Sequence, residues 1–292
     1  MKLLLTGRDG QVGHELLRTL APLGEIIACS RAEMDLSQPQ SLRQKVRSIE
    51  PDWIVNAAAY TAVDQAEKEE ALATAINDEA PGVLAEEAKK LDAGFVHFST
   101  DYVFDGSKSS PYVETDAPNP LGAYGRSKLA GEKTVQSIGG RAWIFRTSWV
   151  YAPRGKNFLL TILRLANERP SLRVVADQFG APTTAALIAE STAKVIDQQI
   201  GKPLPSGLYH LTASGRTTWH GFAEAIVKNG AARGLCGDIP VDPITTAEYP
   251  LPAKRPANSV MDQSQLAAAL GERFPDWREG LKVCLDQVAP QV

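Results

Sequence analysis

The sequence is poor in cysteine, and its cysteines are not paired. There are three, far apart and without a CxxC motif: Cys29, Cys236 and Cys284. An odd, scattered set fits a reducing compartment better than a disulfide framework or a zinc site. The four histidines also lack metal-ligand spacing: His14, His97, His210 and His220. His97 alternates within an apolar run, which favours a structural role.

Long apolar runs and a strong net charge are absent as well. No apolar run approaches the roughly 20 residues that span a bilayer, and MKLLLTG is too short for a signal peptide. The net charge of −3 and the pI near 5.9 predict no general attraction to nucleic acid or to an anionic membrane. We therefore expect a cytoplasmic protein that binds neither.

What the first half does contain is an alternation of short apolar runs with helical patterns. Strands are expected at 2–6, 25–30, 53–58, 94–100 and 141–150, and helices at 11–21, 83–91 and 127–136. Runs that are apolar on both faces and separated by helices indicate a parallel sheet covered on both sides. Right-handed crossovers then give a Rossmann-type, doubly wound α/β fold.

The rhythm changes after Trp149, where proline and glycine become frequent. A strand is expected at 172–177, a helix at 185–200 and another strand at 207–214. We predict a nucleotide-binding domain over 1–150 and a smaller substrate-binding lobe over 151–292, with some later segments returning to the main sheet.

The stretch TGRDGQVG follows the first expected strand and opens the first expected helix. Its glycines, Gly7, Gly10 and Gly13, permit a tight turn whose backbone N–H groups can approach a pyrophosphate at the helix N-terminus. Gln11 and Val12 lie between the last two glycines and belong to the same predicted site. The alternative is a glycine-rich turn without a ligand.

The end of the second expected strand bears on the choice of cofactor. NAD-binding proteins place an acidic side chain there, but this chain has Ser30 and Arg31. An arginine can pair with a 2′-phosphate, so NADPH is favoured, with NADH as an alternative, unless Arg31 points into solvent. Further predicted cofactor contacts are Asp35, Leu36, Ala57, Ala58, Ala59 and Thr61, the alanines because small side chains let a cofactor approach the backbone.

A catalytic group is predicted from AYGRSKLAGEK and the end of the fourth strand. Tyr124 and Lys128 are four residues apart and share a helix face. The lysine ammonium should lower the pKa of the phenol, hold the cofactor ribose and leave the tyrosine as proton donor. Thr100, at the carboxyl end of a strand, can hydrogen-bond the substrate oxygen. A solvated helix pair and a threonine that satisfies the strand end are the alternatives.

With these residues in place, the chain resembles an extended short-chain dehydrogenase/reductase, and more narrowly the dTDP-4-dehydrorhamnose reductase family. The resemblance covers essentially the whole chain and is carried by TGRDGQVG, VNAAAYTAVDQAE, STDYVFDG, YGRSKLAGE, RTSWVYAPRGKNF, DQFGAPT, GLYHLTASG and KRPANS. It implies reduction of the 4-keto group of a dTDP-4-keto-6-deoxy sugar by NAD(P)H. It also implies substrate contacts by Val63, Thr100, Asp101, Tyr124, Trp149, Asn157 and Arg255. For Trp149 core packing is the alternative, and for Arg255 a surface ion pair.

Two family features are in doubt here. Some members carry an acidic residue where this chain has Ser30. Some relatives bind Mg²⁺ at a dimer contact, for which Glu15 and Glu190 are the candidates, although each lies on an ordinary amphipathic helix. Mg²⁺ and a homodimer therefore stay open.

Two other functions compete with reduction. In dehydratases resembling this chain an Asp-Glu pair follows the threonine, whereas Tyr102 follows Asp101 here, which argues against elimination but not against epimerisation. A non-catalytic NADP-binding regulatory subunit would share the fold. The complete set of Thr100, Tyr124 and Lys128 argues against it.

Overall fold

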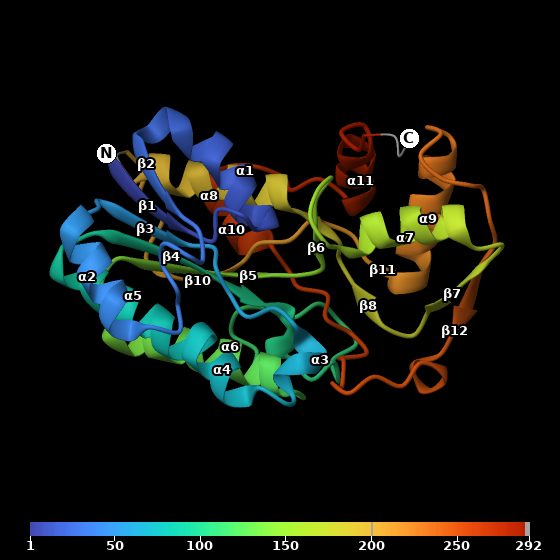
Figure 1. Cartoon of the computed structure of the whole chain (residues 1–292), viewed down its shortest axis with the longest axis horizontal. Coiled ribbons are helices and arrows are strands. Elements are labelled where there is room, and N and C mark those ends of the chain that lie inside the picture. Colours follow the sequence, from blue (N-terminus) through green and yellow to red (C-terminus); the bar gives the residue numbers. More distant parts are fainter. Residues whose placement is uncertain (200, 290–292) are drawn as a thin grey trace.

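A computed structural model describes residues 1–199 and 201–289. Two parts lie side by side (Figure 1): a central sheet with helices on both faces, and a smaller group of helices and short strands. Among the described residues, none of the helices combines the length and the hydropathy needed to cross a membrane.

The central sheet is parallel throughout, and its strand order is β10-β5-β4-β3-β1-β2. Its strands are β1 (Lys2–Thr6), β2 (Glu25–Cys29), β3 (Trp53–Asn56), β4 (Gly94–Thr100), β5 (Ala142–Thr147) and β10 (Gly207–His210). Successive residues such as Leu3, Leu4 and Leu5 are all fully buried, because helices cover both faces. The predicted doubly wound parallel sheet is confirmed.

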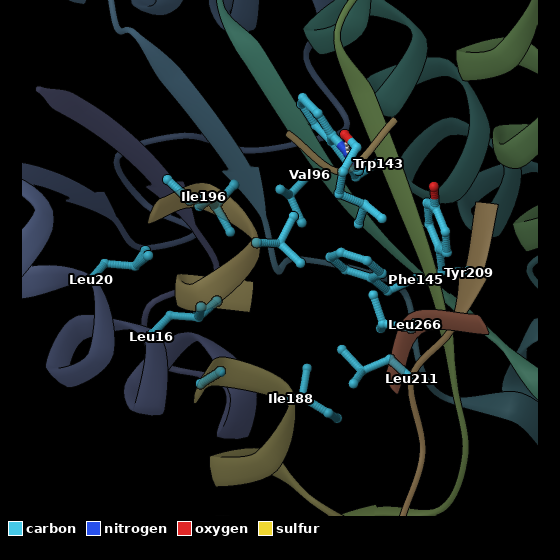
Figure 2. Close-up of a cluster of buried hydrophobic side chains, with 14 of the residues drawn as sticks. Leu16, Leu20, Val96, Trp143, Phe145, Ile188, Ile196, Tyr209, Leu211 and Leu266 are labelled. Carbon is cyan, nitrogen blue, oxygen red and sulfur yellow. Dashed lines mark hydrogen bonds between the residues drawn. The ribbon is translucent and has the colours of Figure 1, made fainter. Parts of the chain in front are cut away.

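One face of the sheet carries α1 (Gln11–Leu20), α8 (Ala185–Gln198) and α10 (Ser264–Leu270). Leu16, Ile188 and Leu266 from these helices meet Val96 and Phe145 of the sheet in the cluster shown in Figure 2. The helix expected over 185–200 would end at Ile200, which lies outside the described residues.

The opposite face carries α2 (Pro39–Ile49), α5 (Ala80–Lys90) and α6 (Ala123–Ile138). Leu42, Leu84 and Val135 from these helices pack on Leu4 and Phe95 of the strands. Leu4 therefore faces this layer while its neighbours Leu3 and Leu5 face the other, as the two-residue period of a strand requires. The connection from β3 to α5 contains α3 (Val63–Ala66), α4 (Glu70–Thr74) and a π-helical turn (Ala75–Glu79).

Five expected strands end earlier than predicted; three of them are β2, β7 (Leu172–Val175) and β10, which end at Cys29, Val175 and His210. β3 ends at Asn56, before the alanines, and the strand expected over 141–150 ends at Thr147. Trp149 has φ 47°, a left-handed conformation that cannot continue an extended strand. The chain then forms a separate strand, β6 (Val150–Tyr151), which pairs with β9 (Thr183–Thr184).

The smaller part has a core of its own. Its helices and remaining strands are α7 (Phe158–Glu168), α9 (Trp219–Ala231), α11 (Trp277–Leu285), β7 (Leu172–Val175), β8 (Phe179–Gly180), β11 (Thr217–Thr218) and β12 (Val241–Ile244). Leu159, Phe222 and Leu281 meet in its core. Short 3₁₀ segments occur at Ala21–Leu23, Asp101–Val103 and Thr246–Glu248. Although α8, β10 and α10 follow residue 150, β10 is a strand of the central sheet, and α8 and α10 pack on one of its faces (Figure 1).

Candidate active site

The turn after β1 brings its glycines against neighbouring backbone. Gly7 has φ 71°, and a Cβ on it would lie 2.8 Å from the amide nitrogen of Ala58. A Cβ on Gly13 would overlap the carbonyl oxygen of Gly7. Gly10 is the N-cap of α1, and no side chain in the described part of the protein caps this helix. The first N–H groups of α1 are therefore available to an anion, and the turn leaves room for a pyrophosphate.

A cleft of about 660 Å³ lies next to this turn, within the usual size range for small-molecule sites. Most of the predicted cofactor residues line it: Gly7, Gly10, Gln11, Val12, Arg31, Asp35, Leu36, Ala57, Ala58, Ala59, Thr61, Tyr124 and Lys128. Gly13 and Ser30 are not among its lining residues. Gly155 and Lys156, which the sequence reasoning missed, also line it. The available signal was their position directly before Asn157 in the RGKNF stretch.

The end of β2 does carry a carboxylate, although position 30 is a serine. Glu33 Oε2 accepts hydrogen bonds from the backbone N of Ser30 (2.8 Å) and from its Oγ (2.7 Å). Arg8 Nη1 lies 3.2 Å from the same oxygen and donates to the carbonyl of Ala28. The two Ser30 bonds lower the pKa of Glu33. The argument against NADH from the missing acidic residue is therefore weakened, because a turn of three residues returns a carboxylate to the strand end.

The three predicted catalytic residues come together at the carboxyl end of β4. Thr100 ends β4, and Tyr124 is the second residue of α6. Lys128 follows one turn later, and its Nζ donates to the carbonyl of Phe98 at 2.6 Å. The start of α6 can lie close to the 3₁₀ segment Asp101–Val103 because position 125 is glycine. A Cβ there would overlap the carbonyl oxygen of Tyr102. Both Tyr124 and Lys128 line the cleft.

Burial dominates the ionisation of these groups. It raises the pKa of Tyr124 to about 12, and the nearby Thr100 side chain offsets only part of that rise. It lowers the pKa of Lys128 to about 8, against the opposing charge of Glu132. The expectation of a lowered pKa for Tyr124 is thus wrong for the protein without a bound ligand, because desolvation of the phenolate is the largest influence and raises the pKa.

Asp101 is a buried carboxylate that is held by hydroxyl groups. It accepts hydrogen bonds from Thr100 Oγ1 at 3.1 Å and from Ser148 Oγ at 3.0 Å. Burial nevertheless raises its pKa to about 6. The Tyr102 ring packs edge-on against Tyr124, with 5.7 Å between centroids.

The predicted contact residues Val63 and Arg255 lie near an ion pair. Arg255 Nη1 and Nη2 donate to the two carboxylate oxygens of Asp64 at 3.1 and 2.8 Å, and Val63 is the residue before it at the start of α3. Arg255 also lies near the Tyr102 phenol, where its charge opposes the rise in the pKa of that phenol that burial causes. The guanidinium is thereby held beside the site, with its fork engaged by a carboxylate that sequence reasoning did not single out.

Trp149 and Asn157 join the smaller lobe to the sheet. The Trp149 ring stacks on Trp219, with centroids 3.6 Å apart and planes within 6°. The Asn157 side chain caps α7 by accepting from Leu160 N, and its Nδ2 donates to Gln11 Oε1 at 2.8 Å. Asn157 thus ties the smaller lobe to the glycine turn.

Glu15 and Glu190, the Mg²⁺ candidates, share a cation. Both carboxylates contact Arg18 Nη2, at 3.3 and 3.1 Å. Over residues 1–199 and 201–289, no group of three or more His, Cys, Asp or Glu side chains has an arrangement suited to a metal. The Mg²⁺ prediction stays untested.

The chain matches one protein family over almost its whole length. Residues 1–289 match the family model of the RmlD substrate binding domain. A curated dTDP-4-dehydrorhamnose reductase from Burkholderia thailandensis is 50% identical over 298 residues, covering 100% of both chains. One from Escherichia coli is 46% identical over 293 residues, covering 99% of this chain and 98% of the relative.

Solved structures agree with the sequence relatives. A dTDP-4-dehydrorhamnose reductase from Clostridium acetobutylicum has a TM-score of 0.91 at 36% identity, covering 98% of this chain and 99% of that one. One from Bacillus anthracis, in complex with NADP, has a TM-score of 0.89 at 35% identity with the same coverage. A UDP-glucose 4-epimerase from Thermus thermophilus, 20% identical with a TM-score of 0.82, shares the fold.

Proposed function

Because this chain belongs to the RmlD substrate binding domain family, that of the dTDP-4-dehydrorhamnose reductases, we propose that it reduces dTDP-4-dehydro-6-deoxy-L-mannose to dTDP-L-rhamnose. It is an oxidoreductase of the short-chain dehydrogenase/reductase type. The observation that carries the specific reaction is the position of Thr100 at the end of β4, beside Tyr124 and Lys128, which lie one helical turn apart and both line the cleft that begins at the glycine turn.

A nicotinamide dinucleotide fits the residues of the cleft. Gly7 leaves space that any Cβ would fill, and the start of α1 presents free N–H groups. Arg31 and Lys156 add positive charge along the cleft. When bound, NAD(P)H supplies the hydride. Lys128 would hold its ribose, and Arg8, Arg31 and Glu33 would meet the adenosine end, where Glu33 favours a ribose hydroxyl and the arginines favour a 2′-phosphate.

Tyr124 supplies the proton. With a pKa near 12 it is a neutral phenol at neutral pH, so its O–H can donate to the substrate oxygen as negative charge develops there. The resulting phenolate is stabilised by the Lys128 ammonium and, once its O–H turns away from Asp101, by the Thr100 hydroxyl. Asp101 orients the Thr100 hydroxyl, and with Trp149, Val63, Asn157 and Arg255 it is proposed to contact the sugar nucleotide.

The test is the absorbance of NADPH during turnover with dTDP-, GDP- and UDP-linked 4-keto-6-deoxy sugars, with NADH in parallel. We expect one equivalent of cofactor to be oxidised per dTDP-sugar reduced. Tyr124→Phe should lower kcat by about 10²–10⁴-fold while cofactor binding stays within a few-fold. Cofactor that is unchanged after turnover would indicate epimerisation, and full activity in Tyr124→Phe would refute the assigned mechanism.

A further inference from the structure

A row of buried polar side chains crosses three neighbouring strands beneath Lys128. Thr6 of β1 is the register partner of Asn56 of β3, and Asn56 is the partner of His97 of β4. Partners on adjacent parallel strands point to the same face, so the three side chains form one line. Thr6, Asn56, His97 and Lys128 are each at most 1% exposed. Polar groups at such positions are costly unless every one is paired.

The row is hydrogen-bonded from end to end. Thr6 Oγ1 donates to Asn56 Oδ1 at 2.6 Å, Asn56 Nδ2 lies 3.1 Å from His97 Nδ1, and His97 Nε2 lies 3.3 Å from Lys128 Nζ. Lys128 also donates to the carbonyl of Phe98. A lysine ammonium has three N–H donors. These two contacts use two of them and leave the third for the cleft that Lys128 lines.

Donor and acceptor rules couple the charge of Lys128 to the rest of the row. An ammonium needs an acceptor at His97 Nε2, so the ring proton must sit on Nδ1 and face the oxygen of the Asn56 amide. If the ring proton sits on Nε2 instead, it must be accepted by a lone pair on Lys128, which is then a neutral amine. Nδ1 must then accept from the nitrogen of the Asn56 amide. The structure has the Asn56 amide in the second orientation, with Nδ2 toward His97 and Oδ1 accepting from Thr6 Oγ1. A half-turn of the amide gives the first arrangement, in which Thr6 Oγ1 accepts instead.

We propose that His97 is a positioning residue for the reduction: it accepts a hydrogen bond from the Lys128 ammonium, and its neutral tautomer, matched by the Asn56 amide, follows the charge of Lys128. This inference rests on the proposed function, in which Lys128 acts as a cation. It gives the row a role that apolar side chains at the same positions could not fill.

The charges around the row favour such coupling. His97 stays neutral near pH 7, because burial and then the charge of Lys128 hold its pKa well below the usual value. Glu132 is the charged group that raises the pKa of Lys128 against the effect of burial, and Arg146 pairs with Glu132 on its far side. Phe95, stacked on the His97 ring, contributes no charge. Between about pH 6.5 and 9.5, a change in the His97 ring therefore reports a change of tautomer.

The direct test is ¹⁵N NMR of the histidine rings in the wild-type protein without cofactor, with four histidines to assign. We expect His97 to carry its proton on Nδ1 at about pH 6.5 and to shift toward Nε2 with a midpoint at the pKa of Lys128, about 8. A Lys128→Met protein should lose this pH response. A single His97 tautomer across the range would overturn the proposal.

Two substitutions of His97 distinguish the roles of its two ring nitrogens, Nδ1 and Nε2. His97→Gln can place an amide oxygen near the Nε2 position, whereas His97→Asn restores a polar group only near Nδ1 and leaves Lys128 without that acceptor. Because a hydrogen bond to a charged group is lost, the alkaline limb of kcat in His97→Asn should move about 1–2 pH units lower, with His97→Gln closer to wild type. Equal pH profiles in two folded variants would refute the role. If the wild type fails to reduce the dTDP-sugar, the proposed function fails, and the NMR titration still decides the inference.

Discussion

Asp101→Asn should make the protein more stable at neutral pH while impairing the site. The folded protein raises the pKa of Asp101 from 3.8 to about 6, a shift of about 2 units, because the carboxylate is buried. Its hydroxyl partners, Thr100 and Ser148, are rotatable and can also serve an amide. The substitution therefore removes a buried charge without leaving its partners unpaired.

The sign and size follow from linkage. Between about pH 4 and 6 the folded state binds more protons at Asp101 than the unfolded state, so the free energy of unfolding falls as the pH rises. Because one pKa unit corresponds to about 1.36 kcal/mol, the free energy of unfolding that is lost above the folded-state pKa is about 3 kcal/mol. Asp101→Asn does not titrate, so its stability relative to wild type should rise by about 3 kcal/mol from about pH 4 to pH 8.

The assay is urea unfolding of both proteins at several pH values, together with kcat/KM. Asp105→Asn is the matched control, because hydrogen bonds from Ser107 and Asn119 lower the pKa of Asp105. Its carboxylate stabilises the fold above the unfolded pKa, so Asp105→Asn should be destabilising at pH 8 and less so as the pH falls. A stability difference for Asp101→Asn that is constant, or that shrinks as the pH rises, would refute the reasoning.

Three further substitutions test the cofactor cleft and its border. Gly7→Ala should weaken cofactor binding by at least about tenfold, measured by calorimetry, because φ 71° and the Ala58 amide at 2.8 Å exclude a Cβ; unchanged affinity would show that the turn does not approach the ligand. Glu33→Gln should raise the ratio of kcat/KM for NADPH to that for NADH severalfold, since a carboxylate repels a 2′-phosphate and accepts from a ribose hydroxyl; a ratio that falls would contradict this role. Gly180→Ala, whose Cβ would overlap the Trp149 indole, should cost about 1–3 kcal/mol in urea unfolding and alter tryptophan emission; wild-type behaviour in both would mean that the indole yields without strain.

Much of the site was accessible from local pattern. The glycine turn, the strand-end threonine and the Tyr124/Lys128 pair each depend on residues within one element or one connection. The predicted ionisation of Tyr124 was wrong for a different reason. Its pKa depends on how much of the protein surrounds the phenol, and the Tyr102 ring, from a different segment of the chain, is among the groups that pack against it.

The carboxylate at the end of β2 was also missed. At position 30, where a strand-end acidic residue would stand, this chain has serine. A short turn brings Glu33 back so that both the backbone N and the hydroxyl of Ser30 donate to it. Only the path of the turn decides this, because several conformations of such a segment are compatible with the same residues.

The sequence by itself determined the layers of this protein and the chemistry at its strand ends, since apolar periodicity and glycine spacing act over a few residues. Tertiary structure alone decided which of those residues meet. The row of Thr6, Asn56 and His97 under Lys128 joins positions far apart in the chain, and it exists because β1, β3 and β4 are neighbours in one register. Strand order and register are set by packing of the whole sheet between its helices, and no local pattern carries that information.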